Sequence, residues 1–260
     1  MNKEKWALIT GASSGIGMSL ALRFAKEGWQ LVLVARDAAR LSALSEIIED
    51  DFHVRTFIIQ KDLTSATAAA EIFEQLDQIG IRLDALINNA GAGACGLFHE
   101  IPGDKDVQMI DLNIRAVTSL SKLVVSHMRQ TGGGKILNVA STGSYQPGPY
   151  IAVYYASKAF VLSFSQALRA ELRSSGVVVS TLCPGSTATE FSRRAGKAEI
   201  KGAMAPDKVA DCAYKGLMKG KAVIIPGFHN KIFIAFSKLM PGSLSAAIVA
   251  HIQRKLTESF

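Results

Sequence analysis

The sequence contains few cysteines and no long apolar run. Its 260 residues include three cysteines, Cys95, Cys183 and Cys212, which are far apart and form no Cys-x-x-Cys pair. An odd number of separated cysteines indicates neither a disulfide framework nor a zinc site, and reduced thiols are typical of cytoplasmic proteins. No apolar stretch reaches the ~18 residues that a membrane span needs, and the first five residues lead into a strand-like run rather than a signal peptide. We therefore predict a cytoplasmic protein without a bound metal.

Dense clusters of one charge are also lacking. The chain has 29 Lys and Arg residues against 22 Asp and Glu residues, a net charge of +7. The basic residues are dispersed, and no basic run is interleaved with aromatic residues, so a nucleic-acid partner is not indicated. A basic surface that attracts a phosphorylated ligand is the favoured interpretation. The hydrophobic content of 48% is sufficient for one sizeable core and excludes a disordered chain.

Short apolar runs alternate with longer helical patterns along the chain. The runs are continuous rather than alternating, which is typical of parallel strands covered on both faces. Repeated strand–helix units without a linker or repeat predict a single-domain, Rossmann-like α/β fold: a doubly wound parallel sheet of about seven strands flanked by helices. The predicted strands are 6–10, 30–35, 54–59, 85–88, 135–139, 177–182 and 222–225. The predicted helices lie near 15–27, 38–50, 66–79, 104–130, 155–175 and 206–219.

The C-terminal stretch follows a different pattern. After Pro226 the apolar residues recur at helical spacing, with the basic residues largely off the apolar face. We predict that residues 1–226 form the catalytic and cofactor-binding domain and that residues 227–260 form an amphipathic helical extension. Packing on this chain's own fold or on a partner subunit is its favoured role; a substrate-site lid and membrane-surface attachment are the alternatives. The predicted apolar face consists of Phe228, Ile232, Phe233, Phe236, Leu239, Met240, Leu244, Ile248, Ile252 and Leu256.

A glycine-rich turn, residues 10–17 (TGASSGIG), follows the first predicted strand and opens the first helix. Gly11 allows the tight turn, Gly15 lets the backbone approach a pyrophosphate, and Gly17 permits close packing of helix on strand. The helix N-terminus offers free N–H groups and the positive end of its dipole to phosphates. The turn therefore predicts a dinucleotide site.

The end of the second predicted strand indicates which dinucleotide is bound. An acid at this strand tip holds the ribose hydroxyls of NAD, whereas a base accommodates the 2′-phosphate of NADP. Ala35 is neutral and is followed by Arg36, whose guanidinium can hold a phosphate with two hydrogen bonds; Arg40, one helical turn on, would assist. Asp37 could be the ribose-binding acid, but the N-cap of helix 38–50 is the favoured interpretation. We predict NADP(H) rather than NAD(H).

Tyr154 and Lys158 lie one helical turn apart on the same face of a predicted helix. A free tyrosine has a pKa near ~10, too high for efficient acid–base work at neutral pH, and a neighbouring ammonium group lowers it. With so many lysines in the chain, the spacing alone would arise by chance roughly 0.3 times. Its context must therefore decide its meaning.

That context resembles the short-chain dehydrogenase/reductase family from Ala7 to about Phe191. Besides the glycine turn, Asp62 resembles the acid that meets the adenine ring, and residues 88–91 (NNAG) resemble the motif of the fourth strand. Asn113 lies in the long helix where the family keeps an asparagine, and Ser141 precedes Tyr154 by the usual interval. Residues 184–189 resemble the segment that meets the nicotinamide.

The resemblance implies roles for individual residues. Ser141 would orient a substrate carbonyl, and Tyr154 would give a proton to its oxygen or take one in reverse. Lys158 would lower the pKa of Tyr154 and hold the nicotinamide ribose. Asn113, through a local distortion of its helix, would position a water that links Lys158 to solvent. The implied cofactor-binding residues are Gly11, Ser13, Ser14, Gly15, Ile16, Gly17, Arg36, Asp62, Leu63, Asn89, Ala90, Gly91, Tyr154, Lys158, Pro184, Gly185, Thr187 and Thr189.

The sequence says less about substrate and assembly. In the family the pocket is closed by segments that correspond here to residues 92–100 and 186–205; the first is small and apolar, which favours a hydrophobic carbonyl or alcohol substrate, and His99 is expected at the surface. Family members usually assemble through helices corresponding to 104–130 and 155–175, which predicts a homodimer or homotetramer. We predict an NADP(H)-dependent enzyme that interconverts a carbonyl and an alcohol, chiefly by reduction. A catalytically silent NADP-binding regulator, an NAD-linked dehydrogenase, and an epimerase or dehydratase are the alternatives.

Overall fold

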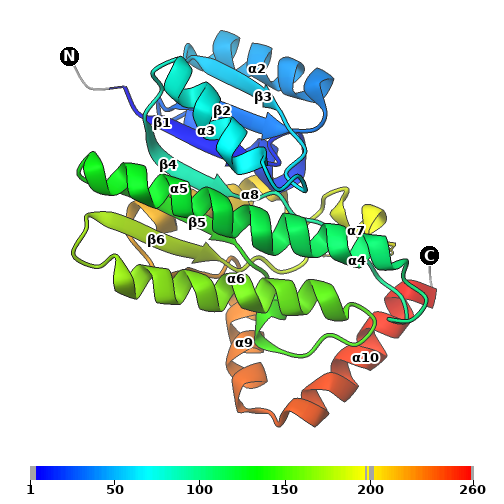
Figure 1. Ribbon diagram of the computed structural model, residues 1–260. Coiled ribbons are helices and arrows are strands. Elements are labelled where there is room, and N and C mark those ends of the chain that lie inside the picture. The colour runs from blue at the N-terminus through cyan, green and yellow to red at the C-terminus, as the bar shows by residue number, and fades with distance from the viewer. Residues whose placement is uncertain (1–3, 197, 199–201, 259–260) are drawn as a thin grey trace.

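Seven parallel strands form the centre of the molecule (Figure 1), in the order β3-β2-β1-β4-β5-β6-β7. The computed structural model describes residues 4–196, 198 and 202–258. All neighbouring strands pair in parallel, so the predicted doubly wound sheet is confirmed. The strands are β1 (Trp6–Thr10), β2 (Gln30–Ala35), β3 (Thr56–Gln60), β4 (Leu83–Asn88), β5 (Gly134–Val139), β6 (Val177–Leu182) and β7 (Val223–Ile224).

Helices cover both faces of the sheet, because successive strand residues point to opposite sides. On one face, Ala7 and Ile9 of β1 share a buried core with α1 (Gly15–Ala25), α2 (Ala38–Phe52) and α8 (Pro206–Met218). On the other face, Leu8 of β1 packs in a core formed with α3 (Ala68–Gln78) and α5 (Val117–Gln130). Helix α6 (Ala152–Glu171) packs on β6 beside α5. The remaining helices are α4 (Gly103–Ile110), α7 (Phe191–Arg194), α9 (Phe228–Leu239) and α10 (Gly242–Glu258).

The order of the strands creates a crevice at their carboxyl ends. From β1 the chain builds outward through β2 and β3, then returns to place β4 on the opposite side of β1. The connections that leave β1 and β4 therefore diverge to opposite faces, and a groove opens between them. In open α/β sheets this is where ligands bind.

Several boundaries differ from the predicted ones. The predicted helix 104–130 is interrupted: α4 is followed by π-helical turns at Asp111–Ala116 before α5 begins. Helix α6 begins at Ala152 rather than 155 and ends at Glu171 rather than 175. Strand β3 is displaced by one or two residues from 54–59 because it pairs in register with β2, Leu31 opposite Thr56. Asp37 is the N-cap of α2, as predicted: its Oδ1 accepts a hydrogen bond from the Arg40 N–H at 3.0 Å.

Buried polar side chains join β4 and β5 to the helices above them. The Asn88 Nδ2 donates to Asn138 Oδ1 at 2.9 Å and to Ser121 Oγ at 3.2 Å. The Asn138 Nδ2 in turn donates to Ser165 Oγ of α6 at 2.9 Å. Buried amides are costly unless they are bonded, so these contacts fix the positions of α5 and α6 relative to the sheet.

The C-terminal extension is helical, as predicted, but its apolar face does not pack on this chain. Helices α9 and α10 form a V at the end of the molecule opposite α2 (Figure 1). The buried side chains of the two helices are Ile234, Ser237, Ser245, Val249 and Gln253. Most of the predicted apolar face is exposed, namely Phe228, Ile232, Phe233, Phe236, Leu239, Leu244, Ile248 and Ile252. Packing on the chain's own fold is therefore wrong for these residues, because no element of the described part of the chain buries their side chains. Within the described residues no helix is both long and apolar enough to span a bilayer.

Candidate active site

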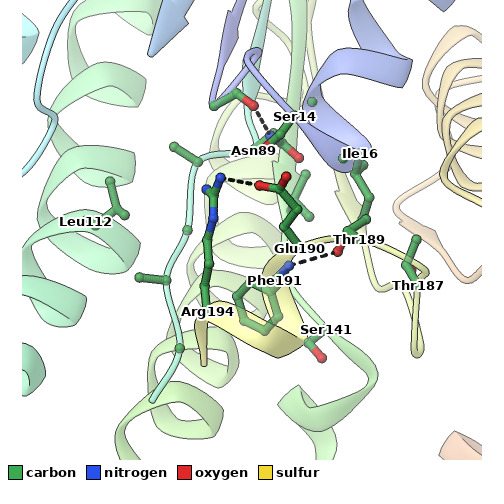
Figure 2. Close-up of a pocket in the computed structure, with 18 of the residues that line it drawn as sticks. Ser14, Ile16, Asn89, Leu112, Ser141, Thr187, Thr189, Glu190, Phe191 and Arg194 are labelled. Atoms are coloured by element: carbon green, nitrogen blue, oxygen red, sulfur yellow. Dashed lines mark hydrogen bonds and ion pairs between the residues drawn. The ribbon is translucent and has the colours of Figure 1, made fainter. Parts of the chain in front are cut away.

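One pocket at the carboxyl ends of the strands collects every predicted site residue except Asn113. The residues come from the β1–α1 turn, the ends of β2, β3 and β4, the segment after β5, the start of α6, and the segment after β6. Figure 2 shows Ser14 and Ile16 on one side of this pocket and Ser141 with Phe191 on the other. Residues predicted from distant parts of the chain are thus brought together.

The glycine turn has the backbone that its sequence predicts. Gly11 and Gly15 have φ values of +66° and +55°, which favour glycine. A Cβ on Gly17 would lie 2.1 Å from the Gly11 carbonyl oxygen, so only glycine lets α1 start so close to the turn. The first turn of α1 carries no acidic residue, and the Ser14 N-cap makes no side-chain cap bond. The helix therefore presents its N–H groups and positive dipole end to the pocket.

Asn89 and Thr10 join the glycine turn to the end of β4. The Asn89 Nδ2 donates to the Thr10 carbonyl at 2.9 Å and to the Gly11 carbonyl at 3.3 Å. The Thr10 Oγ1 accepts from the backbone N–H groups of Asn89 and Ala90, each at 3.0 Å. These four bonds hold the turn and the Asn89–Gly91 segment in one rigid arrangement.

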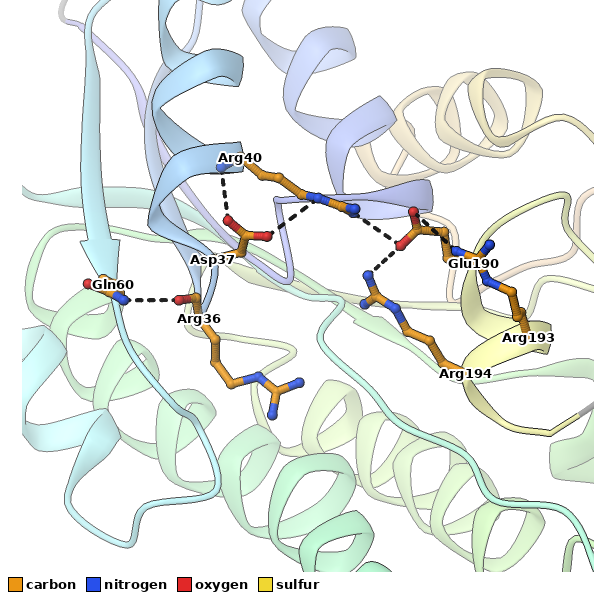
Figure 3. A network of polar contacts seen from close by, with 7 residues as sticks. All are labelled: Arg36, Asp37, Arg40, Gln60, Glu190, Arg193 and Arg194. Carbon is orange, nitrogen blue, oxygen red and sulfur yellow. Dashed lines mark hydrogen bonds and ion pairs between the residues drawn. The ribbon is translucent and has the colours of Figure 1, made fainter.

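Arg36 extends from the end of β2 toward the pocket (Figure 3). Its carbonyl accepts from Gln60 Nε2 at 3.1 Å, but its guanidinium forms no hydrogen bond or ion pair with the described residues. Nearby, Asp62 accepts from the Thr64 N–H at 3.0 Å and the Thr64 hydroxyl at 2.9 Å. Burial opposes ionisation of Asp62, but these bonds and the Arg36 charge hold its pKa below the ordinary value. Arg36 is therefore a cation available to an anionic ligand.

Arg40, which was expected to assist Arg36, is already paired with two carboxylates. Its guanidinium pairs with Glu190 at 3.1 Å and with Asp37 at 3.4 Å. Arg194 binds the same Glu190 carboxylate from the other side (Figure 3). The hydrogen bond from Arg40, with the charges of both arginines, lowers the pKa of Glu190. The sequence did not lead us to predict this connection between α2 and the segment after β6. The spacing of four residues between Glu190 and Arg194 could have indicated that these two side chains pair on a helix.

Tyr154 lies at the start of α6 and faces Ser141. Ser141 caps the short 3₁₀ turn Thr142–Tyr145, with its Oγ accepting from the Gly143 N–H at 3.1 Å. Burial raises the pKa of Tyr154 above its ordinary value, and the hydrogen bond with Ser141 only partly opposes this rise. The phenol therefore keeps its proton at neutral pH in the structure as it stands.

Lys158 is buried beneath Tyr154. Its Nζ donates to the Val139 carbonyl at 2.8 Å and lies 5.9 Å from the centre of the Tyr154 ring. Burial lowers the pKa of Lys158 to about 8, because the charged form loses its hydration. Lys158 is not among the groups that shift the Tyr154 pKa in this structure. The expected lowering of that pKa by Lys158 therefore stays a prediction.

Asn113 lies behind the pocket, inside the π-helical turns. It is fully buried; its Nδ2 donates to the Ala92 carbonyl and to Ser157 Oγ, each at 2.9 Å, and its Oδ1 accepts from the Ala92 N–H at 3.0 Å. A Cβ on Gly91 would lie 3.2 Å from both Asn113 Oδ1 and Lys158 Nζ. The predicted helix distortion is present. Because both amide hydrogens are used, a water in this place would have to bind a carbonyl oxygen.

Comparison with known proteins identifies the family. The model for short chain dehydrogenases matches residues 5–200. The chain belongs to the short-chain dehydrogenase/reductase family.

Several members are similar over most of the chain. Rattus norvegicus 17-beta-hydroxysteroid dehydrogenase type 3 is 35% identical over 73% of this chain and 62% of its own length. Sulfoacetaldehyde reductase 2 of Chromohalobacter salexigens is 36% identical over 71% of this chain and 73% of its length. The match thus spans about three fifths of the rat enzyme's length.

Solved structures give the same family. A Sphingobium yanoikuyae short-chain dehydrogenase in complex with NADPH has a TM-score of 0.83 and 38% identity, covering 91% of this chain and 95% of its own. A bulky-bulky ketone specific alcohol dehydrogenase from Comamonas testosteroni has a TM-score of 0.78 and 35% identity, over 91% and 93%.

The pocket is also lined by residues that were not named as site residues from the sequence, among them Phe191, Tyr155 and Gln253. The Phe191 ring lies 5.3 Å from that of Tyr154, centre to centre, and a Cβ on Gly93 would meet it at 2.8 Å. Phe191 belongs to the segment 186–205 that the resemblance placed at the substrate pocket. A substrate-site lid was one role considered for the extension, but the sequence did not single out Gln253. Leu97, Phe98 and His99, by contrast, lie at the surface. In the predicted segment 186–205, residues 197 and 199–201 lie outside the described part. Within the described residues no three His, Cys, Asp or Glu side chains form a group that could hold a metal.

Lys158 is expected to lose its proton as the pH rises through about 8, well below the 10.5 of an ordinary lysine. Between pH 8 and pH 10.5 the unfolded chain binds this proton and the folded chain does not. Burial of Lys158 therefore lowers the free energy of unfolding below pH 8, and this destabilisation is lost as the pH rises to 10.5. The Nζ titration can be followed by NMR on protein labelled with ¹³C at lysine Cε, with Lys158→Met assigning the signal. A Lys158 signal that stays charged to pH 10 would contradict the burial argument.

Proposed function

We propose that this protein is an NADP(H)-dependent enzyme that interconverts a carbonyl and an alcohol, with Tyr154 as the proton-transferring residue. The observation that carries the proposal is the position of Tyr154: it is hydrogen-bonded to Ser141 and lies above Lys158, in the same pocket as a phosphate-binding glycine turn. Bound NADPH would supply the hydride.

The chain's own residues would act on the substrate oxygen. A tyrosine phenol holds its proton at neutral pH, and in reduction Tyr154 would give that proton to the oxygen. The Ser141 hydroxyl now bonded to Tyr154 would donate to the same oxygen and orient the carbonyl. Lys158, whose Nζ has only the Val139 carbonyl as a hydrogen-bond partner among the described residues, has N–H groups left for the cofactor ribose. Asn113, held by Ala92 and Ser157, would keep the helix distortion that admits a water.

The choice of NADP(H) rests on Arg36. Its unpaired guanidinium at the end of β2 fits a 2′-phosphate, while Asp37 is already used as the cap of α2. A Cβ on Gly17 would collide with the Gly11 carbonyl oxygen, so glycine at this position lets α1 begin directly at the turn and present its N–H groups to a pyrophosphate. The similar Sphingobium yanoikuyae structure holds NADPH. The residues that would hold the cofactor, besides Arg36, are Gly11, Ser13, Ser14, Gly15, Ile16, Gly17, Asp62, Leu63, Asn89, Ala90, Gly91, Tyr154, Lys158, Pro184, Gly185, Thr187 and Thr189.

The substrate side of the pocket favours a hydrophobic carbonyl compound. Phe191, Tyr155 and Leu112 line it together with the small residues Ala92 and Gly93. Similar proteins are named for steroids, long-chain acyl groups and bulky ketones.

A catalytically silent NADP-binding protein is disfavoured because Ser141, Tyr154 and Lys158 are all present and brought together. Val107, Ile110 and Phe160 of α4 and α6 are exposed, which supports a homodimer or homotetramer formed through these helices. The division of the chain into 1–226 and 227–260 and the cytoplasmic location stay predictions.

Removing the Tyr154 hydroxyl should abolish turnover without abolishing cofactor binding. Tyr154→Phe is expected to lower kcat/KM for carbonyl reduction by at least about a hundredfold, the contribution typical of a general acid. NADPH oxidation at 340 nm, with a panel of aldehydes, ketones, steroids and ketoacyl thioesters, measures the loss, and nucleotide fluorescence measures binding. Turnover retained by this variant would refute the role of Tyr154.

Arg36→Ala should raise the KM for NADPH by about tenfold or more, the usual cost of losing a charged hydrogen bond, and should leave the KM for NADH nearly unchanged. Arg40→Ala is the matched control, because Arg40 is held by Glu190 and Asp37 and should matter less. Equal effects of Arg36→Ala on both nucleotides would contradict the cofactor assignment.

A further inference from the structure

Gln253 brings the C-terminal extension into the active-site pocket. It lies in α10 about a hundred residues after Tyr155 in the sequence, yet it lines the same pocket as Ser141 and Tyr154. Only 6% of the residue is exposed. Its Nε2 donates to the Tyr155 hydroxyl at 3.2 Å, whereas its Oε1 is buried without a hydrogen-bond partner in the described part of the chain.

The other contacts around Gln253 hold it in place. The Tyr155 ring is packed against Gly143 and Gly148, where an added Cβ would collide with it at 2.7 Å and 2.4 Å. Tyr155 is also bonded to Gln146, which accepts from Ser237 Oγ of α9 at 3.0 Å. Both C-terminal helices are therefore tied by polar bonds to the residue next to Tyr154.

We propose that Gln253 is a specificity residue whose Oε1 accepts a hydrogen bond from a donor group on the substrate. This inference rests on the proposed carbonyl reduction. The Oε1 has neither solvent contact nor a partner in the described part of the chain, and this costs free energy. A turn of the amide toward an O–H or N–H group of a ligand in the pocket would relieve that cost. Because Gln253 is bonded to Tyr155, whose ring centre is 6.1 Å from that of Tyr154, the donor lies several bonds from the reacting carbonyl. The substrate class is a largely apolar ketone or aldehyde with a second, hydroxyl-like group.

Matched ketones test this assignment. The 3- and 4-hydroxyacetophenones are compared with the 3- and 4-methylacetophenones, which have nearly the same shape but no donor. The wild-type kcat/KM should favour at least one hydroxy ketone over its methyl counterpart by about tenfold, since a site with a buried polar group rejects an analogue that cannot pair with it. Gln253→Leu should reduce that ratio to about one, mainly through KM. Gln253→Glu, which keeps an acceptor oxygen, should retain the preference.

Controls separate specificity from helix packing and from the reaction itself. Val249→Ala removes a buried contact one turn earlier on the same side of α10 and should leave the ratio unchanged. Calorimetry on the NADP⁺-loaded protein measures the dissociation constants of the same ketones. These constants should show the same preference for the hydroxy ketone. If they do but no ketone is reduced, the proposed function fails and the role of Gln253 stands. Equal ratios in wild type and Gln253→Leu, in turnover and in binding, would overturn the role of Gln253.

A second, independent observation concerns the outer side of the same two helices. Eight large apolar side chains are exposed there; Phe236 is 63% and Leu239 is 84% exposed. The extension, residues 227–260, contains four basic residues, Lys231, Lys238, Arg254 and Lys255, and one acidic residue, Glu258. Exposed apolar surface of this extent marks an interaction site. The positive charge of the same helices limits which partners can bind there. A second copy of this face would bring like charges together.

We infer that the outer face of α9 and α10 binds an anionic membrane surface. Lys231 and Lys238 are exposed and by helical spacing border the exposed apolar stripe of α9, the arrangement of a helix that lies in the plane of a membrane interface. The Lys238 Nζ also lies 5.1 Å from the centre of the Tyr145 ring, so Lys231 is the more outward of the two. Apolar side chains enter the headgroup region, and each nearby Lys or Arg adds attraction to anionic lipid. The extension would then have two sides with separate roles: Gln253 faces the pocket and Phe236 faces the lipid.

Vesicle flotation tests this surface on the full chain. The wild-type protein should float with vesicles containing about 30% phosphatidylserine at least tenfold more than with phosphatidylcholine alone, and less at high salt. Phe236→Ser with Leu239→Ser, and separately Lys231→Gln with Lys238→Gln, should each reduce flotation. Ile47→Ser with Ile79→Ser, exposed apolar residues of α2 and at the end of α3, is the matched control and should not. Absence of wild-type flotation, or a dimer that Phe236→Ser with Leu239→Ser converts to a monomer, would overturn the inference.

Discussion

The contact between Asn89 and the end of β1 is the constraint on which the rest of the site depends. The cofactor turn leaves the sheet after β1, and the segment that leads to the catalytic side leaves it after β4. The Asn89 amide and the Thr10 hydroxyl join these two segments through main-chain groups. The same strands are neighbours because the strand order reverses there. A ligand that spans the groove therefore meets two halves whose separation is fixed before it binds.

Burial sets the electrostatics of the catalytic side. Lys158 and Tyr154 are both shifted toward their neutral forms, the lysine downward and the tyrosine upward, because each loses hydration more than it gains from its neighbours. At the other end of the groove, Glu190 pairs with Arg40 and Arg194, and Arg36 is left as a cation without an ion pair among the described residues. The groove thus changes along its length, from an exposed cationic end suited to phosphate to a buried end suited to a carbonyl. That division is independent of any particular substrate.

Sequence reasoning predicted the parts of this molecule whose geometry follows from local rules. The glycine turn, the cap at Asp37 and the doubly wound parallel sheet follow from backbone sterics, capping and handed crossovers, and most of the pocket followed from motifs placed at strand ends. What escaped prediction depends on long-range contacts. Gln253 reaches the pocket only because α10 folds back. Arg40 was expected at a phosphate, but a carboxylate 150 residues away in the sequence holds it.

The C-terminal extension shows why an amphipathic pattern alone does not reveal what a helix packs against. Its periodicity identified one apolar side, and the usual expectation places that side on the core. Here the side that packs on the protein carries Ser237, Ser245 and Gln253, because it borders polar residues at the pocket rather than the sheet's core. The apolar stripe therefore faces outward. In these helices polar side chains are buried against the protein and large apolar side chains are exposed, which is the reverse of the usual arrangement. Such an arrangement is stable only if an apolar surface covers the outer side.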